Sequence, residues 1–295
     1  MVELALAFES YSSLQESLRK EGHLIRSKVR TILDDVVQNG LVEPITGTRY
    51  SGPDIKVDRD RPQVSVVAGP FNSRSRADML AVEYGRDLLP PQRRKRMKFL
   101  GAEGITPLSM ILRGLTPYYL ATEYLPTQEE KKTHFPISHL DLMNIDFEPA
   151  SFDMFFSAHV LEHVPDIAGA IHQIARTLAP GGVLVSTFPL DPDREHTLTK
   201  ARLNAEGGIE HLEEPEYHKN PVQLHEGSLV FQLPGWDILD LCRNAGLTEA
   251  AFVMFASTAH GVLGRKNLGV FALIARKPME DEDPVRKTMR PKRVW

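Results

Sequence analysis

The segment from Asp141 to Pro189 constrains the fold of this chain most strongly, because its apolar residues change period twice. An apolar run over 152–158 has the length and composition of a buried strand. The next apolar residues are spaced by four, three and four, as on one face of a helix: Ile167, Ile171, Ile174 and Leu178. Pro180-Gly181-Gly182 ends this helix, and a second apolar run follows over 183–188. The order strand, helix, strand predicts the crossover unit of a parallel sheet.

A series of short patterns runs through the same segment: Asp141-Leu142, Ser151-Phe-Asp153, His159-Val-Leu-Glu-His-Val164 and Leu178-Ala-Pro-Gly-Gly182. In this order they resemble the class I S-adenosylmethionine-dependent methyltransferases, and most closely the small-molecule branch with a VLEHV segment. The resemblance covers roughly Lys98 to Lys277. It implies an α/β fold with a doubly wound, Rossmann-like sheet of seven strands, parallel with an antiparallel edge strand. It also implies S-adenosyl-L-methionine as the cofactor and methyl transfer as the reaction.

Three regions are predicted along the chain. Residues 1–92 form an N-terminal extension, with a helix over 14–38 and a small β-rich part after it. Residues 93–277 form the methyltransferase core, with an insertion at 190–230. Residues 278–295 are charged and contain proline, which is typical of a flexible tail. In the helix that starts near Asn72, Arg74 and Arg76 are expected to be either solvated or in contact with an anionic ligand.

Composition narrows the partners and the location. The net charge of −4 gives no general attraction to nucleic acid, so a small-molecule acceptor is the expected partner. Apolar runs are too short for a membrane span, and a cytoplasmic protein without membrane contact is therefore expected. Cys242 is the only cysteine, which excludes disulfides within the chain, and it is predicted to be a core residue of a helix. The oligomeric state stays open.

The loop after the strand at 97–101 is the expected contact with the methionine part of the cofactor. Its residues Gly101, Ala102, Glu103 and Gly104 are predicted to wrap the ligand with their backbone. The loop departs from the family, however. Gly101 stands where the family has an acidic residue, and Ile105 stands at a usual glycine position. Glu103 is expected either to replace the missing carboxylate or to be an exposed loop residue.

Two acidic residues at later strand ends complete the predicted cofactor site. Glu123 lies 22 residues after Gly101, and a carboxylate at this spacing suits the two ribose hydroxyls. Tyr124 follows it and is included in the site. The resemblance implies that Asp141 accepts a hydrogen bond from the adenine amino group and that Leu142 holds the ring.

His159 follows the strand at 152–158 and is predicted to face the ligand crevice, near both cofactor and acceptor. With Glu162 and His163 it forms an H-x-x-E-H pattern that could grip a divalent cation on a helical turn. Some quinone methyltransferases bind metal through a similar E-x-x-E-H pattern. Because the first carboxylate is a histidine here, a structural turn is preferred and no metal is predicted.

The insertion after the fifth strand is the expected lid and acceptor site. It spans 191–225 and contains His196, His211, Tyr217 and His218 among several carboxylates. Histidine titrates near neutral pH, so His159, His211 and His218 are the candidate general bases. A polar lid suits a hydroxylated acceptor such as a sugar or a phenol. The alternative is a non-catalytic relative that has lost cofactor binding. A nicotinamide dehydrogenase is disfavoured, because no strand is followed by G-x-G-x-x-G.

Overall fold

The computed structural model describes residues 2–58, 61, 64, 66–222 and 227–279. The predicted flexible tail therefore lies mostly outside the described residues. The chain forms two compact units. One contains the described residues of Met1–Tyr84 together with Ala251–Ile274, and the other contains Gly85–Ala250 together with 275–279.

The second unit contains a parallel sheet of five strands in the order β10, β9, β6, β7, β8. In chain order these strands are β6 (Phe99–Gly101), β7 (Tyr119–Glu123), β8 (Ser138–His139), β9 (Phe152–Ala158) and β10 (Leu178–Thr187). The helices of this unit are α4 (Pro91–Arg94), α5 (Pro107–Leu115), α6 (Gln128–Thr133), α7 (Ile167–Thr177) and α8 (Ile238–Asn244). Cys242 is buried on α8, as predicted.

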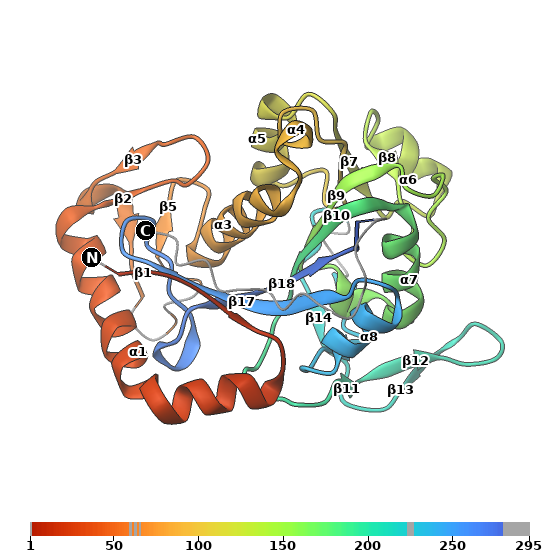
Figure 1. Cartoon of the computed structure of the whole chain (residues 1–295). Coiled ribbons are helices and arrows are strands. Elements are labelled where there is room, and N and C mark those ends of the chain that lie inside the picture. Colours follow the sequence, from red (N-terminus) through yellow and green to blue (C-terminus); the bar gives the residue numbers. More distant parts are fainter. Residues whose placement is uncertain (1, 59–60, 62–63, 65, 223–226, 280–295) are drawn as a thin grey trace. The chain divides into compact units, whose positions relative to one another are not determined.

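The predicted crossover unit is present as β9, α7 and β10 (Figure 1). The predicted stripe of α7 is buried, and Asp166 caps the helix by accepting a hydrogen bond from the Gly169 N–H at 2.9 Å. Nearly all of β9 is buried, as expected for a parallel strand covered on both faces. Between β9 and α7 lies a single turn of 3₁₀ helix, η2 (Leu161–His163). The turn sits at the carboxyl end of β9, the edge at which open α/β sheets bind ligands.

The insertion between β10 and α8 is built from short antiparallel pairs that the sequence did not predict. The pairs are β11 (Leu198–Thr199) with β16 (Gln232–Leu233), β12 (Ala201–Leu203) with β13 (Ile209–His211), and β14 (Tyr217–His218) with β15 (Ser228–Leu229). Figure 1 shows β12 and β13 as a projecting hairpin. His225, in the expected lid, lies outside the described residues.

The first unit begins with β1 (Glu3–Phe8), a strand that was not predicted, and continues with α1 (Tyr11–Asn39). The helix predicted over 14–38 is confirmed as α1, which buries Leu14, Ile25, Val29, Ile32, Leu33 and Val36. Gly40 ends the helix with φ of +79°. The β-rich part after it consists of β2 (Leu41–Val42), β3 (Arg49–Tyr50), a 3₁₀ turn η1 (Gly52–Asp54), β4 (Ile55–Lys56) and β5 (Val67–Ala68). Helix α3 (Ser73–Leu88) follows these elements in the chain.

Strand β1 pairs antiparallel with β17 (Glu249–Ser257), whose neighbour in strand order is β18 (Val270–Arg276). A 3₁₀ turn, η3 (Arg265–Asn267), lies between β17 and β18 in the chain. The five parallel strands together with β1, β17 and β18 make eight strands, one more than the seven predicted. The predicted α/β class, mainly parallel with antiparallel strands, is confirmed.

Arg76 is neither solvated nor placed on a ligand. Its side chain is fully buried in the first unit, and its guanidinium donates to four backbone carbonyls, those of Val66, Phe71, His260 and Gly261. Burial lowers the pKa of Arg76 to about 10. The residue therefore joins loop backbones rather than binding a substrate. Among the described residues, no helix is long and apolar enough to cross a membrane.

Candidate active site

The loop after β6 is shaped by Tyr119 of the neighbouring strand. A Cβ atom added to Gly101 would lie only 2.2 Å from the Tyr119 hydroxyl oxygen. That hydroxyl lies 3.1 Å from the Ser109 hydroxyl, and burial raises the pKa of Tyr119. The missing acidic residue at position 101 thus has a physical cause, because the tyrosine fills the space that its side chain would need.

Glu123 holds the same loop from the end of β7. Its Oε1 accepts from the backbone N–H groups of Gly104 and Ile105, at 2.9 and 3.2 Å. Gly104 approaches its neighbours closely, since an added Cβ would lie 2.9 Å from Ile137 Cγ2. Burial raises the pKa of Glu123, although the two backbone hydrogen bonds oppose the shift. Because both bonds use Oε1, the second oxygen is the one through which a diol would bind.

Asp141 and Leu142 lie in a turn after β8. The Met143 N–H donates to Asp141 Oδ1 at 2.9 Å, and Leu142 is buried. Tyr124 is exposed and lies against the His139 ring, with centroids 5.7 Å apart. The strand ends after β6, β7 and β8 thus carry every residue of the predicted cofactor site except His159.

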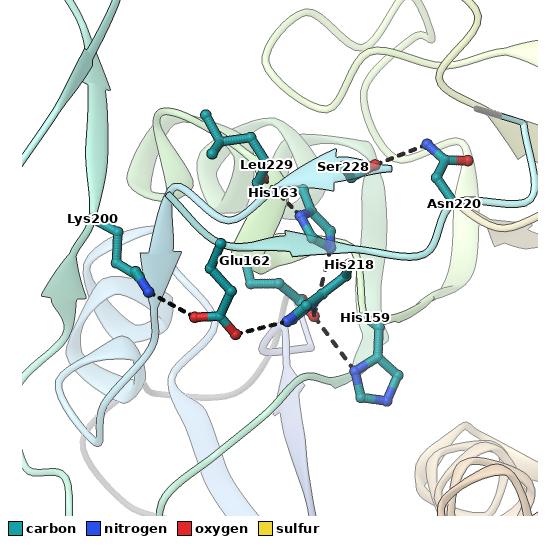
Figure 2. Close-up of polar contacts among 9 residues, drawn as sticks. His159, Glu162, His163, Lys200, His218, Asn220, Ser228 and Leu229 are labelled. Carbon is teal, nitrogen blue, oxygen red and sulfur yellow. Dashed lines mark hydrogen bonds and ion pairs between the residues drawn. The ribbon is translucent and has the colours of Figure 1, made fainter. Parts of the chain in front are cut away.

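Glu162, on η2, is the most unusual polar residue of the unit. Its side chain is 0% exposed, and three imidazole nitrogens surround its Oε1 (Figure 2). The distances are 3.4 Å to His159 Nδ1, 3.7 Å to His218 Nδ1 and 3.9 Å to His163 Nε2. These are ion-pair distances and too long for hydrogen bonds. Burial alone would raise the pKa of Glu162, but the imidazoles of His159 and His218 outweigh it and lower the pKa to about 2.

The insertion contacts the η2 turn through its backbone. The Phe231 N–H donates to the Glu162 carbonyl at 2.9 Å, and His163 Nδ1 lies 2.8 Å from the Leu229 carbonyl. Burial lowers the pKa of His163. The chain around β15 and β16 therefore contacts the 3₁₀ turn. Strand β14 pairs with β15 and places His218 beside Glu162.

A chain of charges continues from His218 into the insertion (Figure 2). His218 Nε2 lies 3.2 Å from Glu216 Oε1, and Lys200 Nζ donates to Glu216 Oε2 at 2.7 Å. The contact with Glu162 raises the pKa of His218, and the bond from Lys200 lowers that of Glu216. Lys200 and Glu216 were missed in the sequence, where no spacing pattern connects them with His218.

His159 stands in a strained backbone conformation at the end of β9. Its φ is +57°, a left-handed value that costs energy in a residue other than glycine. Its N–H donates to the Thr187 carbonyl at 2.7 Å, and its side chain is 28% exposed. The imidazole lies 3.4 Å from Glu162 Oε1, and part of the ring is accessible.

The three predicted bases do not gather at one place. His159 and His218 both contact Glu162. His211 lies at the end of β13, where it is exposed and pairs with Ala201 of β12. Within the described residues it is not among the groups around Glu162.

Comparison with known proteins assigns the central part of this unit. Residues 114–186 match the family described as Methyltransferase domain. A curated relative, the sterol 24-C-methyltransferase erg6 of Aspergillus fumigatus, is 30% identical over 105 residues. That alignment covers 34% of this chain and 26% of the relative, so the chain spans about a quarter of that protein's length.

Solved structures with similar folds were also found. A methyltransferase from Mesorhizobium loti is 16% identical with a TM-score of 0.37, and covers 66% of this chain and 96% of its own. The sugar N-methyltransferase KedS8 from Streptoalloteichus sp is 18% identical with a TM-score of 0.41. The match covers 70% of this chain and 90% of KedS8. At this similarity they carry no information about the acceptor.

The donor set at the strand ends is compatible with S-adenosylmethionine, because Glu123 Oε1 accepts both loop hydrogen bonds and its second oxygen is left for a diol. The family match falls on the crossover unit that carries the VLEHV segment. Residues 114–186, about a quarter of the chain, thus match the methyltransferase domain family.

Proposed function

We propose that this protein is a methyltransferase that transfers the methyl group of S-adenosylmethionine to an oxygen or nitrogen of a small, hydroxylated acceptor such as a sugar or a phenol. The observation that supports this acceptor class is the pair formed by His159 and Glu162 at the carboxyl end of β9. A partly exposed imidazole lies 3.4 Å from a fully buried carboxylate there. Such a pair is suited to removing a proton from a hydroxyl or ammonium group.

The geometry gives each member of the pair a role. The Glu162 anion favours the hydrogen on His159 Nδ1, which leaves the lone pair of Nε2 for the acceptor proton. His159 Nε2 would take this proton as the acceptor oxygen or nitrogen gains the methyl group. When bound, the cofactor supplies a methyl group on a positively charged sulfur, which leaves as a neutral thioether. Most of the remaining rate enhancement comes from holding donor and acceptor in line.

The proposed cofactor contacts follow from the strand ends. The backbone of Gly101, Ala102, Glu103 and Gly104 is assigned to the methionine part, and Glu123 with Tyr124 to the ribose. Asp141 and Leu142 are assigned to the adenine, and His159 to the side of the methyl group. The polar insertion is assigned to the acceptor, with His218 adjoining Glu162.

The experiment uses methyl-labelled S-adenosylmethionine with a panel of sugars and phenols, and also a sterol, because the curated relative is named for one. His159→Gln should lose most of the transfer, by about 10²–10⁴-fold for a lost general base, while calorimetry shows cofactor binding unchanged. His172→Gln, on the exposed surface of α7, is the matched control. Full transfer by His159→Gln would refute the assigned base.

The non-catalytic alternative has one observation in its favour. Tyr119 fills the space beside Gly101 that an acidic side chain has in the family. Calorimetry of the wild-type chain separates the two cases: absence of S-adenosylmethionine binding would establish the alternative, and binding would exclude it.

A further inference from the structure

The carboxylate of Glu162 lacks the partners that a buried anion needs. It is completely buried, and neither of its oxygens accepts a hydrogen bond from the described residues. Leaving a buried carboxylate without hydrogen bonds is costly. The nearest groups are three imidazoles at 3.4 to 3.9 Å from Oε1.

The orientation of His163 makes the cost larger rather than smaller. A backbone carbonyl can only accept, so the 2.8 Å contact with Leu229 places the hydrogen of His163 on Nδ1. In the neutral ring, Nε2 then carries a lone pair, and it faces Glu162 Oε1 across 3.9 Å. Two electron-rich atoms facing each other in a buried place repel, unless a cation lies between them.

His218 is oriented in a matching way from the opposite side. Its Nε2 lies 3.2 Å from the Glu216 carboxylate, an acceptor, so that nitrogen carries a hydrogen. Its other nitrogen, Nδ1, faces Glu162 Oε1 at 3.7 Å. A carboxylate or carbonyl that holds one ring nitrogen and leaves the other for an ion is the arrangement found around metal-binding histidines. Glu216 and the Leu229 carbonyl provide it for His218 and His163.

We propose that Glu162, His163 and His218 bind one divalent transition-metal ion. Their three ligand atoms lie within 4.8 Å of one another. Bonds of about 2.0–2.2 Å in a tetrahedral site would bring the atoms to roughly 3.3–3.6 Å apart, closer than the 3.7 and 3.9 Å that separate Glu162 Oε1 from the imidazole nitrogens of His218 and His163. Three protein ligands leave a position for water or for an acceptor oxygen, as in catalytic zinc sites.

The ligand types select the class of metal. Two imidazoles and one carboxylate suit Zn²⁺, Co²⁺ or Fe²⁺, whereas Mg²⁺ and Ca²⁺ prefer oxygen ligands. A metal ion bound here would give these residues a role beyond the structural turn expected from the sequence. The ligand set also differs from the H-x-x-E-H pattern, because His218 takes the place of His159. His218 comes from β14 of the insertion, and His159 stays outside the ligand set.

Metal binding requires neither cofactor nor acceptor, so it can be tested apart from methyl transfer. The chain, stripped with a chelator, is titrated with Co²⁺ and then with Zn²⁺, following Co²⁺ absorption and bound metal per chain. We expect about one ion per chain, displacement of Co²⁺ by Zn²⁺, and no competition from Mg²⁺. Glu162→Gln and His218→Gln should abolish binding, and Glu216→Gln should weaken it by about 10–100-fold. His172→Gln, an exposed histidine on α7, should bind like the wild type.

The opposite results are equally clear. If the wild type binds no Co²⁺ or Zn²⁺, or if Glu162→Gln and His218→Gln bind as the wild type does, the proposal is wrong and a protonated His218 balances Glu162 instead. Circular dichroism checks the fold of each variant. If Glu162→Gln fails to fold, His218→Gln decides, because that side chain is only partly buried in the insertion.

Discussion

Glu123 Oε1 accepts two hydrogen bonds from the loop backbone, and the proposal assigns the other carboxylate oxygen to the ribose. Only the ionised form accepts two ribose hydrogen bonds. Because burial raises its pKa, cofactor affinity should be full well above that pKa and fall as the pH drops through it, earlier than for an ordinary carboxylate.

Glu123→Gln keeps an oxygen for the loop but removes the charge. Its affinity for S-adenosylmethionine should be about tenfold weaker or more, with the pH dependence flattened. Calorimetry between pH 5 and pH 8 measures both. An unchanged affinity in Glu123→Gln would remove this residue from the site, and Asp141→Asn is the parallel variant for the adenine contact.

Gly101 shows how a departure from a family pattern can have a local cause. Adding a methyl group there brings it against the Tyr119 hydroxyl, so Gly101→Ala should cost about 1–3 kcal/mol of unfolding free energy. Tyr119→Phe removes the nearest atom and should recover part of that cost in the double variant. Urea unfolding of the two single variants and the double variant gives the coupling. Additive effects would contradict the contact.

Residue positions that depend on local spacing could be predicted from the sequence. Contacts between residues far apart in the chain could not. The positions of Glu123 and Asp141 at strand ends follow from strand lengths. His218, in contrast, meets Glu162 because β14 pairs with β15, and no periodicity shows that pairing. The exposed position of His211 follows from the same unpredicted strands.

At the scale of elements, α7 was predicted almost to the residue because its apolar spacing and its stop signals agree. Asp166 is the cap, and Asp166→Ala removes the acceptor of the Gly169 N–H. The variant should lose about 0.5–2 kcal/mol of unfolding free energy, and Asp166→Asn should lose much less. Urea unfolding compares the two. Equal losses would show that the charge, and not the cap bond, matters.

The insertion could not be predicted as an element because its strands are only two or three residues long. Two residues are too few to show the alternation of a strand. Its strands are instead held by contacts with distant parts of the unit, such as Phe231 with Glu162 and Lys200 with Glu216. Polar residues such as Lys200 and Glu216 therefore help to order the insertion.

On the scale of the whole molecule, all the assigned residues come from the second unit. The cofactor residues follow β6, β7 and β8, and the residues assigned to the acceptor follow β9 or lie in the insertion. The proposal thus assigns cofactor binding and acceptor binding to different strand ends of one sheet edge. Variants should therefore be able to lose either one without the other.

The insertion offers two histidines that test this separation. His218 contacts Glu162, while His211 is exposed on β13, so only His218→Ala should disturb the arrangement of His159 and Glu162. Methyl transfer should fall by about 10–100-fold in His218→Ala and change little in His211→Ala. Cofactor affinity should be unchanged in both variants, because neither residue lies at the ends of β6, β7 or β8. Calorimetry and labelled methyl transfer are measured on the same preparations. If His211→Ala loses transfer as strongly as His218→Ala does, the acceptor lies along the β12–β13 hairpin. The proposal that the acceptor binds beside His159 and Glu162 is then wrong.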